Sequence, residues 1–249
     1  MKSSFLKKRC DLGLFWLIPL VLLMPTEGWA DLAPEKLDYR LRYMWILPVG
    51  KVSMSVEPYL LDKKDIYQIS GSYHSPAWFS MLFNLKGRIS SYIDTRNLLP
   101  LRYEEFYSYP WHDDIKTVLI YDQDRKRVYI DRNGEKETKH IFENTVDPLS
   151  ALFFARNQTW SVGEERKFNL NNHQSNYQLT MRCDRYEKIS GYEAAHVMGD
   201  IRKYDAAARI SNVKFEIWIS RPPSRLPLKM NVQTKLGHLS LQLRRKDAF

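Results

Sequence analysis

Alternation of apolar and polar residues most constrains this chain, because it recurs along almost the whole sequence. Between positions 37 and 47 every odd residue is apolar, from Leu37 to Leu47. A period of two residues is typical of a β-strand with one face in the core. We therefore predict one strand over 37–47, ended by Pro48 and Gly50.

The same pattern predicts many further strands. Asn133-Gly134 is a good hairpin turn, because both residues tolerate positive φ, and turns are also expected at 62–65 and 221–223. The predicted strands are 52–56, 67–73, 89–93, 101–107, 115–121, 127–131, 166–170, 177–183, 192–202, 213–219, 228–232 and 239–243.

One segment breaks this rhythm and predicts a short helix over about 148–157. Asp147 is a good N-cap because its carboxylate can accept hydrogen bonds from the free N–H groups of the first turn. Pro148 suits the first helical position. The apolar face of this helix consists of Leu149, Leu152 and Phe153.

Asp147 and Arg156 stand at opposite ends of this helix, so at about 1.5 Å rise per residue they should not pair with each other. We expect Arg156 to contact carbonyls at the C-terminal end or a carboxylate from a strand. Alternatively, Asp147, Ser150 and Arg156 form a polar rim for ligand headgroups.

These elements predict a mainly β fold. An antiparallel sheet with one apolar face must cover that face by closing or by wrapping another element. We therefore expect a strongly curved antiparallel sheet that forms an open or half-closed β-barrel around the helix at 148–157. No linker or fixed-period repeat divides the mature chain, which indicates a single domain over 31–249.

The N-terminus has the pattern of a secretion signal. Four basic residues precede an apolar run over 12–24, and Gly28 and Ala30 supply small residues at a cleavage site. We predict cleavage after Ala30 and a periplasmic protein; a retained signal anchor is the alternative. Removal of 30 of the 249 residues leaves 219 with Cys183 alone, so no intramolecular disulfide is possible. We read Cys183 as an ordinary strand residue.

Motifs for catalysis or metal binding are not evident. The histidines lack metal-ligand spacing, and the cluster at 112–114 is expected to be a loop. Ser150 lacks the surroundings of a nucleophile elbow, and no glycine-rich phosphate loop is present. We expect a non-enzymatic protein without metal or cofactor.

Positive charge is the other compositional bias. The formal net charge is +9, or +7 without residues 1–30, which carry four basic and two acidic side chains. Dispersed cations favour solvated strand faces, or attraction to anionic lipid headgroups and acidic envelope polymers. Nucleic acid is not an expected partner, whereas peripheral contact with a membrane is compatible with this charge.

Large aromatic residues are numerous for one domain. They predict either core filling or a cavity between sheet and helix that takes an acyl chain. The segment 77–85 is expected to be a core helix or an apolar lid. A filled core would instead favour a structural or interaction module that docks an envelope protein. The candidate ligand contacts are Trp45, Trp78, Phe79, Phe83, Leu152, Phe153 and Trp218.

Several motifs together resemble a known family. They comprise Ser-Tyr-Ile-Asp at 91–94 with Leu-Pro-Leu-Arg at 99–102, Asp-Pro-Leu-Ser-Ala-Leu at 147–152 with Arg156, Trp-Ile-Ser at 218–220 with Leu-Pro at 226–227, and Leu-Arg-Tyr at 41–43 with Pro-Val-Gly at 48–50. With these the chain resembles the bacterial domain-of-unknown-function family 3108. The resemblance implies an exported protein and assigns no reaction.

The segment 216–230, with Trp218 before a turn and Leu226-Pro227 after it, is also similar to a strand pair of the periplasmic lipoprotein carriers and their outer-membrane receptors. That resemblance implies an open β-barrel that wraps helices and shelters a lipid or lipoprotein acyl chain. The chain departs from those proteins in having one evident helix and no lipid-attachment cysteine.

Overall fold

The computed structural model describes residues 32–76, 86–109, 112–173, 175–204, 213–234 and 237–248. Contacts along the chain separate residues 1–30 from residues 31–249, and the following concerns the second unit. Its strands are β1 (Glu35–Tyr43), β2 (Leu47–Leu61), β3 (Lys64–His74), β4 (Lys86–Asp94), β5 (Pro100–Tyr109), β6 (His112–Asp122), β7 (Arg127–Arg132), β8 (Glu135–His140), β9 (Thr145–Val146), β10 (Glu165–Asn171), β11 (Asn176–Ile189), β12 (Tyr192–Lys203), β13 (Val213–Ser220), β14 (Pro227–Thr234) and β15 (Gly237–Ala248).

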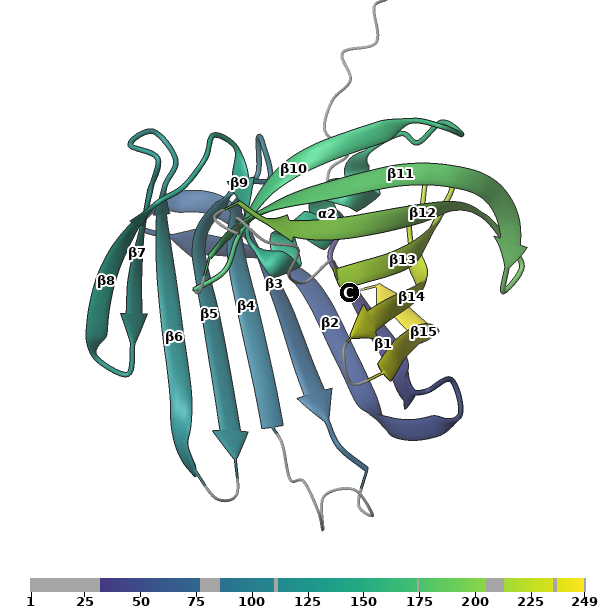
Figure 1. Cartoon of the computed structure of the whole chain (residues 1–249), viewed down its shortest axis with the longest axis horizontal. Coiled ribbons are helices and arrows are strands. Elements are labelled where there is room, and N and C mark those ends of the chain that lie inside the picture. The colour runs from purple at the N-terminus through teal and green to yellow at the C-terminus, as the bar shows by residue number, and fades with distance from the viewer. Residues whose placement is uncertain are drawn as a thin grey trace, which may run out of the picture. The chain divides into compact units, whose positions relative to one another are not determined.

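All these strands belong to one sheet, in the order β8-β7-β6-β5-β4-β3-β2-β1-β15-β14-β13-β12-β11-β10-β9. Neighbours are antiparallel except β9 and β10, which are parallel. The pairing of β1 with β15 joins the N-terminal and C-terminal halves, and the sheet curves so that the halves face each other (Figure 1). The predicted open, strongly curved sheet around one helix is confirmed.

The sheet is not closed by a strand pair, because β8 and β9 are its two edges. Side chains nevertheless bridge the two ends. Asn176 Nδ2 donates to the His140 carbonyl at 2.7 Å, and Lys139 Nζ of β8 donates to the His173 carbonyl at 3.1 Å. The barrel is therefore half closed, by individual hydrogen bonds rather than by a ladder.

Helix α2 (Pro148–Asn157) lies between the two halves of the sheet (Figure 1). Its bounds agree with the predicted helix. Leu149 and Phe153 pack into the core cluster built mainly from β2–β7, while Ala151 and Ala155 pack into the cluster from β10–β13. The helix thus fills the space that the curved sheet encloses.

The predicted strand over 37–47 is wrong, because β1 ends at Tyr43 and β2 begins at Leu47. The turn between them comprises residues 44–46, and Tyr43 pairs with Leu47. A three-residue turn places Tyr43 opposite Leu47, so the apolar alternation of the sequence continues through the turn without a visible break. Pro48 lies inside β2 at a register shift, where a missing N–H is tolerated.

The Asn133-Gly134 hairpin is confirmed, with φ of 52° and 91°. Residues 112–114, expected to be a loop, instead begin β6. Strands β8 and β9 were not predicted. The sequence of β8, EKETKH, has no apolar residue to reveal a period, which suits an exposed sheet edge.

Candidate functional site

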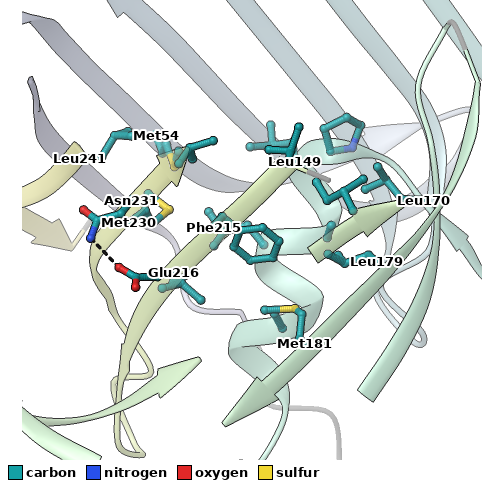
Figure 2. A pocket seen from close by; sticks show the side chains of 18 of the residues that line it. Met54, Leu149, Leu170, Leu179, Met181, Phe215, Glu216, Met230, Asn231 and Leu241 are labelled. Atoms are coloured by element: carbon teal, nitrogen blue, oxygen red, sulfur yellow. Dashed lines mark hydrogen bonds between the residues drawn. The ribbon is translucent and has the colours of Figure 1, made fainter. Parts of the chain in front are cut away.

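A cavity of about 350 Å³ lies between α2 and the C-terminal half of the sheet (Figure 2). One wall is the helix and the others are strands, mainly β10–β15. The lining consists of Met54, Ile89, Pro148, Leu149, Ala151, Leu152, Ala155, Leu170, Leu179, Met181, Ile201, Val213, Phe215, Glu216, Ile217, Met230, Asn231, Val232 and Leu241.

The helix does not fill the cavity, because the residues on its face toward β10–β13 are small. Ala151 and Ala155 are four residues apart and so share one helix face. Their methyl groups are too short to fill the distance to the sheet, whereas Phe153, which is fully buried, packs toward β2–β7. The cavity follows from small side chains on one face of α2 and a large one on the other.

Phe215 forms a large part of the sheet wall, and its position depends on Gly199. The two residues are paired across β12 and β13. A Cβ atom at position 199 would fall within the Phe215 ring. Glycine therefore allows the ring to lie flat across β12 instead of filling the cavity.

Glu216 and Asn231 are the two polar lining residues, and they bond to each other. Asn231 Nδ2 donates to Glu216 Oε2 at 2.9 Å (Figure 2). By strand alternation their side chains lie on the face opposite Phe215 and Met230, which point inward. The side chains that reach into the cavity are thus apolar.

Asp147 fixes the start of the helix beside the cavity. Its Oδ1 accepts from the N–H groups of Leu149 and Ser150, each at 2.8 Å, and its Oδ2 accepts from Ser91 Oγ at 2.5 Å. Ser150 Oγ in turn accepts from the Asp147 N–H at 2.9 Å, which completes a capping box. The predicted N-cap is confirmed. Burial raises the pKa of the Asp147 carboxyl, although these donors act in the opposite direction.

Arg156 anchors the other end of the helix. Its Nη2 lies 2.6 Å from Glu35 Oε1 on β1, and its Nε donates to the Arg225 carbonyl at 2.8 Å. The predicted contact with a strand carboxylate is confirmed, and Asp147 has its own separate partners. Asp147, Ser150 and Arg156 are all buried, which agrees with a role in holding the helix in the sheet.

Of the aromatic and apolar residues predicted to bind ligand, only Leu152 is among the described cavity residues. Phe153 points to the opposite cluster. Trp218 lies on the other face of β13, where its ring stacks on His196 at 4.5 Å between centroids. Trp45 lies in the β1–β2 turn and is 45% exposed. These three residues do not line the cavity, and their contact with a ligand stays a prediction.

Trp78, Phe79 and Phe83, with the whole segment 77–85, lie outside the described residues, so its role as core or lid stays a prediction.

Sequence reasoning missed most of the lining, including Phe215, Met181 and Met230. A signal was available, because Phe215 shares strand parity with Ile217, whereas Trp218 does not. In a sheet, the parity of a strand position indicates which face a side chain occupies, whereas the size or aromaticity of the side chain does not.

The described ranges also contain one cysteine and several residues of the types that ligate metals. Cys183 is a buried residue of β11, as predicted, and burial raises the pKa of its thiol. In the same part of the chain no group of three His, Cys, Asp or Glu side chains is arranged to hold a metal ion. No helix there has the length and apolar character to cross a bilayer.

Comparison with solved structures shows the fold. A β-barrel-like protein of domain of unknown function DUF1849 from Brucella abortus is 8% identical with a TM-score of 0.58, and the match covers 88% of this chain and 99% of that one. A putative lipoprotein from Parabacteroides distasonis is 10% identical with a TM-score of 0.38, covering 88% and 98%. The lipoprotein LppX from Mycobacterium tuberculosis is 11% identical with a TM-score of 0.27, covering 84% and 84%.

No protein with a curated description matches this sequence. The family described as "Protein of unknown function (DUF3108)" matches residues 38–244, which is most of the chain and includes the motifs that suggested it. The protein therefore belongs to the DUF3108 family.

Proposed function

We propose that this protein is a non-enzymatic periplasmic protein that binds an apolar envelope ligand, a lipid or a lipoprotein acyl chain, between the curved sheet and α2. The observation that carries the proposal is the apolar cavity beside Leu152, Phe215 and Met181. Ligand sites are typically concave, mostly apolar and about 300–1,000 Å³ in volume. A cavity of about 350 Å³ is near the lower limit, so a single slender chain suits it better than a ring system.

Binding energy would come from burial of methylene groups, at about 0.8 kcal/mol for each. The side chains that reach into the cavity are apolar, so a charged or strongly polar molecule would lose hydration without compensation. An acyl chain with its headgroup outside the cavity avoids that loss.

Export is part of the proposal. The basic, apolar and small-residue pattern of residues 1–30 supports secretion with cleavage after Ala30. The resemblance of segment 216–230 to lipoprotein carriers is in keeping with a ligand from the envelope. An interaction module with a filled core is the competing function, and the cavity is an argument against it.

Native mass spectrometry of the mature chain 31–249, purified gently and followed by lipid extraction, tests the proposal. We expect a co-purified lipid, or uptake of a fluorescent fatty acid by the apo protein. An apo mass together with no uptake would refute ligand binding and favour the interaction module.

Two helix variants locate the ligand. Leu152→Trp places a large ring in the cavity and should abolish uptake. Phe153→Leu changes the adjacent residue, which packs away from the cavity, and should reduce stability while uptake persists. Thermal melts establish that both variants fold. Equal uptake by Leu152→Trp and wild type would place the ligand elsewhere.

A further inference from the structure

The turn between β1 and β2 exposes four consecutive large apolar residues. Ile46 is 85% exposed, Met44 46%, Trp45 45% and Leu47 44%. We call residues 44–47 the apolar tip; it projects from the sheet at the lower right of Figure 1. Single exposed apolar residues are ordinary, but a contiguous group marks an interaction surface.

Four other described hairpin turns are polar, and the apolar Leu98 and Leu99 of the β4–β5 turn are buried. Residues 62–63 are Asp-Lys, 123–126 are Gln-Asp-Arg-Lys, 133–134 are Asn-Gly and 190–191 are Ser-Gly. Met44 and Trp45 also adopt positive φ, at 49° and 67°, a conformation that suits Gly or Asn far better than bulky side chains. Trp45 stacks on the His238 ring at 5.7 Å between centroids, but neither turn geometry nor solvent exposure accounts for Ile46, which is 85% exposed.

A group of cationic and hydrogen-bonding side chains lies directly behind the tip. Arg40 pairs with Lys51 across β1 and β2, and Lys51 pairs with His74 across β2 and β3. All three line a hollow of about 460 Å³ that also includes Pro48 and Gly50. The hollow therefore adjoins the apolar tip.

This group lacks counter-charge in the described part of the chain. No ion pair joins Arg40, Lys51 or His74 to a described carboxylate. Like charges directly opposite each other on neighbouring strands repel, so the Arg40–Lys51 pair would be relieved by an anion from outside. A phosphate group has the required charge and hydrogen-bond acceptors.

The distance between the apolar tip and the cationic side chains matches the depth of a membrane interface. Arg42 is two residues behind Met44, or roughly 7 Å along the strand. Interfacial segments bury their apolar side about 5–10 Å into the boundary of headgroups and acyl chains. Trp prefers that depth, and long basic side chains behind it reach the phosphates.

We propose that residues 44–47 dock on an anionic phospholipid bilayer, with Met44, Trp45, Ile46 and Leu47 inserted in the interface and Arg40, Arg42, Lys51 and His74 bound to headgroup phosphates. This surface is separate from the cavity, and the proposal does not depend on a cavity ligand.

Flotation with vesicles tests it, using the mature chain 31–249. The vesicles are phosphatidylethanolamine with phosphatidylglycerol, compared with phosphatidylcholine alone, at low and high salt. Wild type should bind the anionic vesicles and lose binding as salt rises. Ile46→Asp should weaken binding by about tenfold or more, because it places a charge in the apolar boundary.

A control for the tip is Leu60→Asp, since Leu60 is 62% exposed at the opposite end of β2. It should bind as wild type does. For the cations, Arg40→Gln combined with Lys51→Gln should weaken binding by about 25-fold, or about fivefold for each charge. Arg182→Gln with Lys188→Gln removes the same charge from β11 and should have little effect.

Fatty-acid uptake provides the second measurement, and Ile46→Asp should leave it unchanged. The proposal is overturned if wild type ignores anionic vesicles, if Ile46→Asp binds as well as wild type, or if Leu60→Asp is equally defective. Equal binding to phosphatidylcholine would overturn the headgroup contacts. Crosslinking of the tip to a protein, without vesicle binding, would overturn membrane docking in favour of a protein partner.

Discussion

Replacement of Asp147 should separate its role as an acceptor from its role as a charge. Asp147→Ala removes the acceptor for the Leu149 and Ser150 N–H groups and for the Ser91 hydroxyl. Asp147→Asn keeps a carbonyl oxygen that can accept from the helix, while its amide can donate to Ser91. The two variants therefore differ in hydrogen bonding and share the loss of charge.

The magnitude for Asp147→Ala follows from two contributions. Loss of an N-cap costs about 0.5–2 kcal/mol. A buried hydroxyl without an acceptor, here that of Ser91, costs about 1–3 kcal/mol more. We expect a total of about 2–4 kcal/mol, which lowers the midpoint of thermal unfolding by roughly 5–15 °C in a domain of this size. Asp147→Asn should remain within about 1 kcal/mol of wild type near neutral pH.

The charge of Asp147 should affect how the free energy of unfolding depends on pH. Burial raises the pKa of Asp147 in the folded protein above its ordinary value of 3.8. The folded state therefore holds this proton more tightly than the unfolded chain does. Relative to Asp147→Asn, the wild-type free energy of unfolding must fall as pH rises from about 3.8 to the raised pKa, and it should be constant above that pKa.

Urea denaturation of wild type and both variants between pH 4 and 8 measures these differences. Because the other titrating groups are shared, the difference between wild type and Asp147→Asn isolates position 147. The capping account is refuted if Asp147→Ala retains full stability or if Asp147→Asn is as damaged as Asp147→Ala. A wild-type advantage that grows with pH would refute the sign of the pKa shift.

Two further predictions concern the cavity wall and the helix anchor. Gly199→Ala should push the Phe215 ring into the cavity, costing about 1–3 kcal/mol from overpacking and reducing fatty-acid uptake; unchanged uptake in a titration would contradict the proposed wall. Arg156→Met should cost about 3–5 kcal/mol because it leaves the Glu35 carboxylate buried, with Lys246 at 3.6 Å as its remaining ion-pair partner among the described residues; adding Glu35→Gln to the Arg156→Met variant should recover much of that loss in urea melts.

Local signals explain which parts of the fold were predictable. The helix begins where Asp147 and Pro148 satisfy a first turn, and both are next to the residues that they affect. Strand alternation is equally local, and it located most of the strands. The pairing of β1 with β15 and the parallel contact of β9 with β10 depend on residues far apart in sequence, so periodicity cannot reveal them.

The cavity was harder to predict than the sheet. A cavity forms where the side chains of facing elements are too short to contact each other. In the sequence, Ala151 and Ala155 are ordinary helix residues and give no sign of such a gap. Large aromatic residues were selected instead, yet Phe153 fills the opposite core cluster and Trp218 occupies the other sheet face. Large side chains mark where space is filled; small ones opposite a curved sheet mark where it remains.

Strands β1, β2 and β15 connect the two proposed sites and set their separation. The far end of the cavity lining is Met54 on β2, seven residues or roughly 23 Å from Leu47 in the apolar tip. The near end includes Leu241 on β15, which pairs with Leu41, three residues or roughly 10 Å from Met44. An interfacial segment inserts about 5–10 Å, so a docked tip would bring the near end of the cavity to the headgroup region while the far end stays outside the bilayer. Docking would therefore shorten the path of an acyl chain from the membrane to the cavity, and occupancy would still depend on the apolar lining.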